Sequence, residues 1–74
     1  MIITVKLFAT LRDGRFDAKE IEYPEGTTIR QIAEELSISP EEANIIFVNS
    51  RHAKFEQELY DGDILGLFPL IGGG

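Results

Sequence analysis

Three consecutive glycines, Gly72 to Gly74, follow an apolar segment that begins at Ile64 and continues through Pro69. Glycine has no Cβ, so such a tail can enter a slot that is too narrow for other residues. A carboxylate presented on Gly74 could be adenylated by ATP, and a sulfur or nitrogen nucleophile could then displace AMP. We therefore expect Gly72 and Gly73 to provide access and the Gly74 carboxylate to react.

A glycine-rich end is also typical of a frayed terminus, and that is the alternative reading of these residues. Their position directly after a proline-terminated apolar strand favours function. We expect residues 1–71 to form one folded domain and residues 72–74 to form a flexible tail, because glycine has the highest backbone entropy.

The remaining side chains form no complete active site. The chain has no cysteine, and its single histidine, His52, has no second ligand at metal-binding spacing, so we expect no metal site. Asp61 and Asp63 flank Gly62, which is ordinary turn chemistry before a strand. The sequence therefore predicts a carrier or substrate protein, with no bound cofactor, rather than a catalyst.

Composition narrows the class of protein further. A chain of 74 residues forms one domain, and its net charge of −6 makes nucleic acid an unfavourable partner. The longest apolar stretch, Ile64 to Ile71, is too short to span a bilayer. The first residues lack the basic start and long apolar region of a signal peptide, so we expect a cytoplasmic protein.

Hydrophobic periodicity predicts the elements that must position the tail. Alternation predicts a strand through Ile3, Val5 and Leu7, and a second over 19–23 after an Asp13-Gly14 turn. Thr28 and Gln31 stand at capping-box spacing before a helix whose apolar side is formed by Ile29, Ile32, Ala33 and Leu36. Further strands are expected at 45–48 and 64–68, with weak pairing by 53–56.

This order predicts an α+β fold of the β-grasp type, which is the ubiquitin-like architecture. It would contain a mixed sheet of four to five strands with one main helix packed on one face. The last strand is apolar on both faces, which indicates a central position beside the first strand.

Phe8, Pro69 and Phe68 are candidates for a partner-binding surface near the tail. Successive strand residues point to opposite faces, so one of Leu67 and Phe68 must face inward and the other outward. Phe8 could lie beside the outward residue, although placement in the core is the more cautious interpretation. An exposed aromatic patch would indicate a partner surface.

Several segments together resemble the MoaD/ThiS sulfur carriers. These are Val5-Lys-Leu-Phe-Ala-Thr-Leu-Arg12, Val48-Asn49, and Leu59-Tyr-Asp-Gly-Asp63 with Leu67-Phe-Pro-Leu-Ile-Gly-Gly-Gly74. The resemblance implies that an enzyme of the ubiquitin-activating type adenylates Gly74 with ATP and converts it to a thiocarboxylate. A chain without cysteine cannot hold a persulfide, which agrees with sulfur carried at the C-terminus.

The resemblance implies two groups of partners, the activating enzyme and a sulfur acceptor. The acceptor would be the large subunit of molybdopterin synthase, with this chain as the small non-catalytic subunit, or else the thiazole synthase of thiamine biosynthesis. The Phe68-Pro69 pair is nearer the molybdopterin branch. A ubiquitin-like modifier joined to lysines through Gly74, or a plain interaction domain with an idle tail, remains open.

Overall fold

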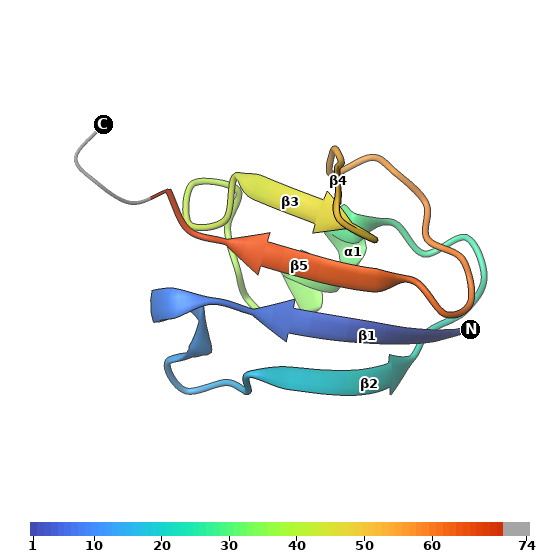
Figure 1. Ribbon diagram of the computed structural model, residues 1–74, viewed down its shortest axis with the longest axis horizontal. Coiled ribbons are helices and arrows are strands. Elements are labelled where there is room, and N and C mark those ends of the chain that lie inside the picture. Colours follow the sequence, from blue (N-terminus) through green and yellow to red (C-terminus); the bar gives the residue numbers. More distant parts are fainter. Residues whose placement is uncertain (71–74) are drawn as a thin grey trace.

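The computed structural model describes residues 1–70, which form one five-stranded sheet with one α-helix on one face (Figure 1). The strands are β1 (Ile2–Leu7), β2 (Ala18–Glu22), β3 (Ile45–Val48), β4 (Arg51–His52) and β5 (Ile64–Phe68), the 3₁₀ helix is η1 (Ala9–Arg12), and the helix is α1 (Ile29–Glu35). The sheet order is β2-β1-β5-β3-β4. The expected β-grasp fold is therefore confirmed.

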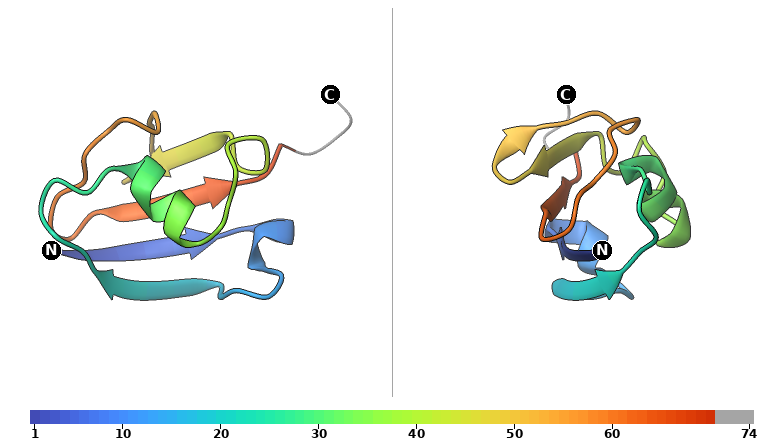
Figure 2. Two further views of the ribbon diagram at one scale, coloured as in Figure 1. Left: turned by 180° about the vertical axis from the view of Figure 1, so that it is seen from behind. Right: turned by 90° about the vertical axis from the view of Figure 1, so that its right-hand side faces the viewer.

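The central position of β5 is also confirmed. It runs parallel to β1 and antiparallel to β3. Figure 2 shows the sheet edge-on, with α1 covering one face and the other face left open. We call the open side the outer face. The inner face is lined by fully buried side chains from β1 and β5, among them Val5, Leu65 and Leu67.

The start of α1 follows directly from its sequence. The Thr28 side chain accepts from the backbone N–H of Gln31, and Gln31 Oε1 accepts from the backbone N–H of Thr28, which completes the expected capping box. Two further N–H groups of the first turn, at Ile29 and Arg30, donate to carbonyls of the 55–57 loop. The first N–H groups of a helix have no partners within the helix, and here they are bonded to other groups, so the first turn of α1 is held in place.

This loop corrects one sequence expectation. Residues 53–56, predicted to pair weakly with β3, do not form a strand, and the pairing is made by β4 directly after a two-residue turn. Of the predicted segment, Ala53 donates one backbone hydrogen bond to the Ile46 carbonyl of β3 at 3.0 Å. Asn49 and Ser50 form that turn with φ of 51° and 69°. β4 contains only Arg51 and His52. Farther along the chain, the carbonyls of Phe55 and Gln57 accept hydrogen bonds from the first turn of α1.

The Asp61-Gly62-Asp63 segment is the turn that the sequence predicts. Gly62 has φ of 87°, which favours glycine. Asp61 Oδ1 accepts from the backbone N–H of Ile2 at 2.7 Å, and Asp63 Oδ2 accepts from that of Tyr60 at 2.8 Å. Asp63 Oδ1 also accepts from the Asn49 side-chain amide at 2.9 Å. These carboxylates therefore fix the start of β5 against its neighbours, which is the turn role that the sequence predicts.

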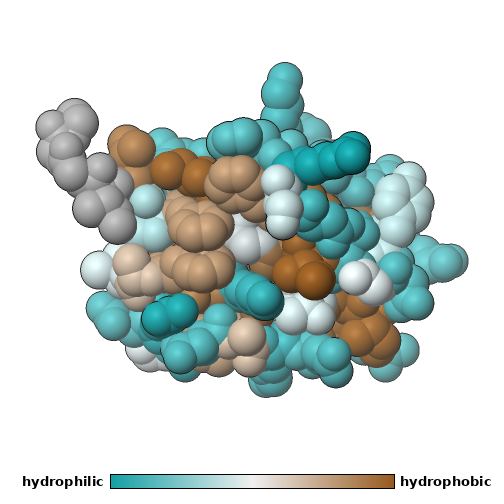
Figure 3. All heavy atoms as spheres, viewed as in Figure 1, coloured by the Kyte–Doolittle hydropathy of each residue, from teal (hydrophilic) through white to brown (hydrophobic). Residues whose placement is uncertain are grey.

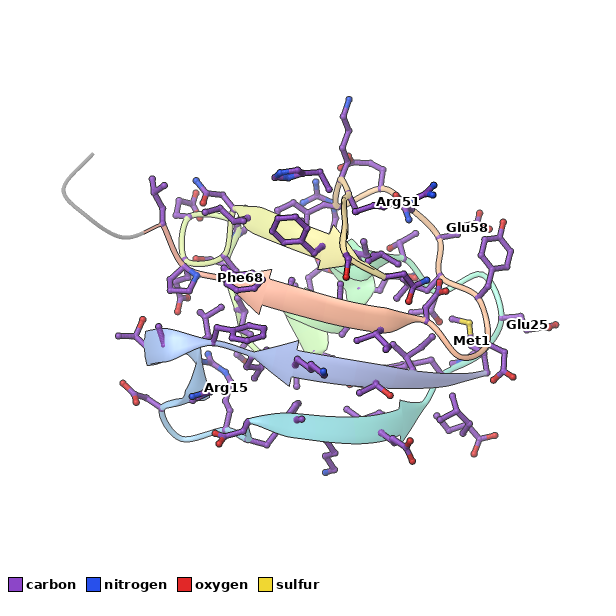
Figure 4. All side chains as sticks on the ribbon, in the orientation of Figure 1. Met1, Arg15, Glu25, Arg51, Glu58 and Phe68 are labelled. Atoms are coloured by element: carbon purple, nitrogen blue, oxygen red, sulfur yellow. The ribbon has the colours of Figure 1, made fainter. Side chains whose placement is uncertain are left out.

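Arg15 ties the end of α1 to the loop after β1 (Figure 4). Its guanidinium donates to the carbonyls of Leu36 and Ser37, each at 3.0 Å, and to that of Leu11 at 3.1 Å. These carbonyls lie where a helix leaves its last C=O groups unpaired. One planar side chain thus joins η1 to the helix end.

We expect Arg15→Ala to lower the free energy of unfolding by about 2 kcal/mol, because it removes several charge-assisted hydrogen bonds. Arg15→Lys should recover only part of this, since an ammonium cannot form the same fork. Urea denaturation measures both changes. Arg51→Ala, at an exposed position on β4, is the matched control and should cost under about 0.5 kcal/mol. Equal losses in the two alanine variants would contradict this role of Arg15.

Candidate functional site

The strand that leads to the proposed tail ends at one end of the molecule. Figure 1 shows that β5 ends at one side of the sheet. After Phe68, the last residue of β5, Pro69 is half-buried and Leu70 is 61% exposed. Gly72, Gly73 and Gly74, together with Ile71, lie outside the described residues. The site can therefore be built from the surface beside the point where the chain leaves the sheet.

Three aromatic rings, from Phe8, Phe47 and Phe68, meet on the outer face next to that point. The rings of Phe8 and Phe68 are stacked with centroids 4.0 Å apart and planes 4° apart. Phe47 contacts Phe68 edge-on at 5.6 Å. We call these three residues the aromatic cluster. All three are only half-buried, and hydrophobic residues gather on this face around the end of β5 (Figure 3).

The register of the sheet explains how the cluster forms. Gly66 of β5 lies opposite Lys6 of β1 and opposite Phe47 of β3, so one cross-strand row carries no side chain at its centre. A Cβ at Gly66 would lie 3.4 Å from a carbon of the Phe68 ring and 3.5 Å from one of the Phe8 ring. Both distances are ordinary van der Waals contacts, so an alanine would fit beside the two rings, whereas a larger side chain would compete with them for the same space.

The structure decides the orientation of the candidate side chains. Leu67 is fully buried and Phe68 points outward, as the alternation requires. Placement of Phe8 in the core, the more cautious sequence interpretation, is wrong: Phe8 follows β1 on the same face as Lys6 and stacks on Phe68 instead. The Phe8 ring packs against the Phe68 ring rather than against side chains of the core.

Sequence reasoning missed Phe47 and Gly66 as members of the site. The signal was present in 45–48, where alternation places Phe47 on the face opposite to the buried Ile46 and Val48. What the sequence could not supply was the β3–β5 register that places Phe47 beside Gly66.

A shallow hollow of about 340 Å³ lies over this surface. It is lined by Lys6, Phe8, Phe47, Ser50, Ile64, Gly66 and Phe68. The centroid of the His52 ring lies 4.4 Å from that of the Phe47 ring, so His52 extends the aromatic surface toward β4. The hollow is apolar, open and built on rigid strands, which suits docking of another protein rather than enclosure of a small molecule.

Titratable groups with shifted pKa values lie away from this surface. Burial raises the pKa of Tyr23, and the hydrogen bond that its hydroxyl donates to Glu35 adds to that rise. The hydrogen bond from Arg30 lowers the pKa of Glu56 on the opposite side of the fold. Neither Tyr23 nor Glu56 lines the hollow over the aromatic cluster.

Within residues 1–70, no cluster of three or more His, Asp or Glu side chains is arranged to hold a metal ion. In the same part of the chain, no helix is long and apolar enough to cross a membrane.

Comparison with known proteins gives a family match over nearly the whole chain. The model of the ThiS family matches residues 5–74. A Pyrococcus furiosus protein, provisionally named molybdopterin converting factor subunit 1, is 34% identical, with 96% of this chain and 99% of that chain covered and a TM-score of 0.76.

More distant solved structures share the fold. The Haloferax volcanii small archaeal modifier protein 1 has 18% identity and a TM-score of 0.74, with 95% of this chain and 98% of that chain covered. Subunit 1 of the Helicobacter pylori molybdopterin-converting factor, solved in a complex with subunit 2, has 19% identity and a TM-score of 0.64, with both chains fully covered.

Proposed function

Because the chain belongs to the ThiS family of small ubiquitin-like sulfur carriers and modifiers, we propose that it carries sulfur as a thiocarboxylate on Gly74. The observation that carries this proposal is the family match, which extends through Gly72-Gly73-Gly74 at residues 72–74. The sequence has no cysteine that could hold sulfur elsewhere.

The proposed chemistry has two steps, both performed by an activating enzyme of the ubiquitin-activating type. A carboxylate oxygen of Gly74 attacks the α-phosphorus of ATP, and pyrophosphate leaves. A hydrosulfide equivalent then attacks the carbonyl carbon of the acyl-adenylate, AMP leaves, and a thiocarboxylate remains. ATP is a substrate of the partner and is not a resident cofactor of this chain. The glycines allow the tail to enter the partner's active site, since they have no side chains to exclude it.

We propose that the sulfur goes to molybdopterin synthesis, with the large subunit of molybdopterin synthase as acceptor. The 34% identity to the Pyrococcus furiosus protein supports this destination, as does the Phe68-Pro69 pair. Sulfur transfer to a thiazole synthase in thiamine synthesis is the second candidate. Conjugation of Gly74 to lysines is the third, and the shared fold of the small archaeal modifier protein 1 is the observation that keeps it open.

We propose that the aromatic cluster and Pro69 are the surface on which the activating enzyme docks. Exposed aromatic side chains are frequent anchors of protein interfaces. Phe8 and Phe68 are stacked at 4.0 Å and therefore lose little freedom on binding. The cluster lies directly before the tail, so an enzyme that binds it also receives Gly74.

The first test is intact-protein mass spectrometry after incubation with the activating enzyme of the same cell, ATP and a sulfur source. We expect the mass to rise by the difference between one sulfur and one oxygen atom, about 16 Da, with the change confined to the C-terminal peptide. Omission of ATP is the control and should leave the mass unchanged. Added sulfur on another peptide, or none with the cognate enzyme, would exclude the carrier function.

The same samples distinguish the alternatives. Branched peptides joining Gly74 to lysine would favour the modifier. Purified thiocarboxylate protein should convert a molybdopterin precursor only with the large synthase subunit, and transfer to thiazole synthase instead would favour the thiamine pathway.

A further inference from the structure

The charges around the aromatic cluster differ from those of the rest of the chain. The sequence holds thirteen acidic residues against seven Lys and Arg residues. Even so, none of the residues that line the hollow over the cluster is acidic, and one of them is Lys6. This part of the outer face therefore has a sign opposite to that of the whole molecule.

The Lys6 ammonium is available to a partner. Its side chain is exposed on β1, in the cross-strand row with Gly66 and Phe47. The two ion pairs found among residues 1–70 join Arg12 to Asp17 and Arg30 to Glu56, so neither uses Lys6. A second cation, the Arg12 guanidinium, lies 5.6 Å from the centre of the Phe8 ring, although Asp17 partly neutralises it.

Two acidic residues of β2 lie on the outer face farther from the end of β5 than Lys6. Glu20 and Glu22 of β2 pair with Thr4 and Ile2 of β1, so they share a face with Lys6 but are displaced along the strands toward the N-terminus. In the row of β1 and β2 that contains Lys6 and Ala18, Lys6 is therefore the charged residue, and Glu20 and Glu22 lie one and two rows farther from the end of β5. Asp17 lies at the cluster end but is paired with Arg12.

We propose that the activating enzyme presents carboxylate side chains beside an apolar surface, and that one of these carboxylates pairs with Lys6 when the aromatic cluster docks. This inference rests on the proposed function and adds the chemistry of the partner. An acidic, apolar surface is attracted by the end of the sheet that carries the tail and repelled by the Glu20–Glu22 end. The charges therefore orient the encounter so that the tail meets the active site.

The test measures ATP–pyrophosphate exchange by the cognate activating enzyme as a function of the concentration of the full-length chain. Lys6→Glu should raise KM about tenfold at low salt, because it replaces an attraction by a repulsion at the interface. Lys6→Gln should give a smaller increase. In about 1 M salt, where the Debye length falls to about 3 Å, the ratio of variant to wild-type KM should approach one.

Lys54→Glu is the matched control, since it changes the net charge equally but lies on the 53–57 loop, outside the hollow. It should change KM less than about twofold. Equal increases in both Glu variants would show only a net-charge effect and would overturn the inference, as would no increase with Lys6→Glu. Thermal melts of the variants confirm that each remains folded.

Phe68→Ala separates failure of this inference from failure of the docking proposal. If Phe68→Ala raises KM while Lys6→Glu does not, the cluster docks but the partner is not acidic there. If neither variant changes KM, the cluster is not the docking surface. Absence of exchange with the wild-type chain would overturn both the inference and the carrier function beneath it.

Discussion

Deletion of Gly73 and Gly74 should reduce adenylation and thiocarboxylate formation to background while leaving the melting temperature nearly unchanged. The deletion moves the carboxylate out of reach of the enzyme's catalytic groups, and positioning of reacting atoms accounts for much of an enzyme's rate. Glycines have no side chains, so their loss removes little buried apolar surface. ATP–pyrophosphate exchange, intact mass and a thermal melt measure the three quantities.

Gly73→Leu is the companion variant, because it keeps the length of the tail and the Gly74 carboxylate but adds a large side chain. We expect it to lose most of its activation as well, since a tail that must enter a narrow slot cannot carry a leucine. Full activation of Gly73→Leu would show that reach alone matters. A deletion variant that unfolds would show that the glycines are structural and would overturn our account of the tail.

Leu67→Ala should have the larger effect on stability and Phe68→Ala the larger effect on docking, although the two residues are neighbours on β5. Leu67 is fully buried, so its truncation should lower the free energy of unfolding by about 3 kcal/mol. Phe68 is half-buried on the outer face, and losing its stacking on Phe8 should cost about 1 kcal/mol. For docking the order reverses: Phe68→Ala should raise KM for the activating enzyme about 30-fold, which corresponds to about 2 kcal/mol.

Urea denaturation and exchange kinetics on the same two proteins check this prediction. The kinetic measurement is made where both variants are fully folded, so that a rise in KM reflects contact and not unfolding. Equal losses of stability would mean that Phe68 belongs to the core. A large rise in KM for Leu67→Ala alone would mean that the interface depends on the shape of the sheet and not on the cluster.

The three proposed destinations of Gly74 share one activation step, so the docking proposal predicts the same effect of the cluster variants for each of them. The aromatic cluster lies beside the end of β5, so the same cluster variants can be measured with each candidate partner. The acidic-partner inference applies to the activating enzyme alone, so the same Lys6 variants measured with the large synthase subunit would tell whether the two partners use the same charge.

The sequence alone determined where the main strands and the helix form, because the patterns that predict them involve residues close together in the chain. The period-two alternation of Ile3, Val5 and Leu7 and the Thr28–Gln31 capping box act between residues a few positions apart, and both have the predicted structures. The central place of β5 follows from its hydrophobicity on both faces, since only a covered strand can bury so much apolar surface. The expectation that the Gly74 carboxylate reacts rests on the sequence and the family match, because residues 71–74 lie outside the described part of the chain.

Tertiary structure decided the surface that surrounds this chemistry. Phe8, Phe47 and Phe68 are far apart in the chain, and only the register of β1, β5 and β3 brings their rings together over Gly66. The same register places Lys6 among them. Register depends on how the whole sheet packs against α1, because a shift of one residue would turn every outward side chain inward. No short-range pattern contains that information.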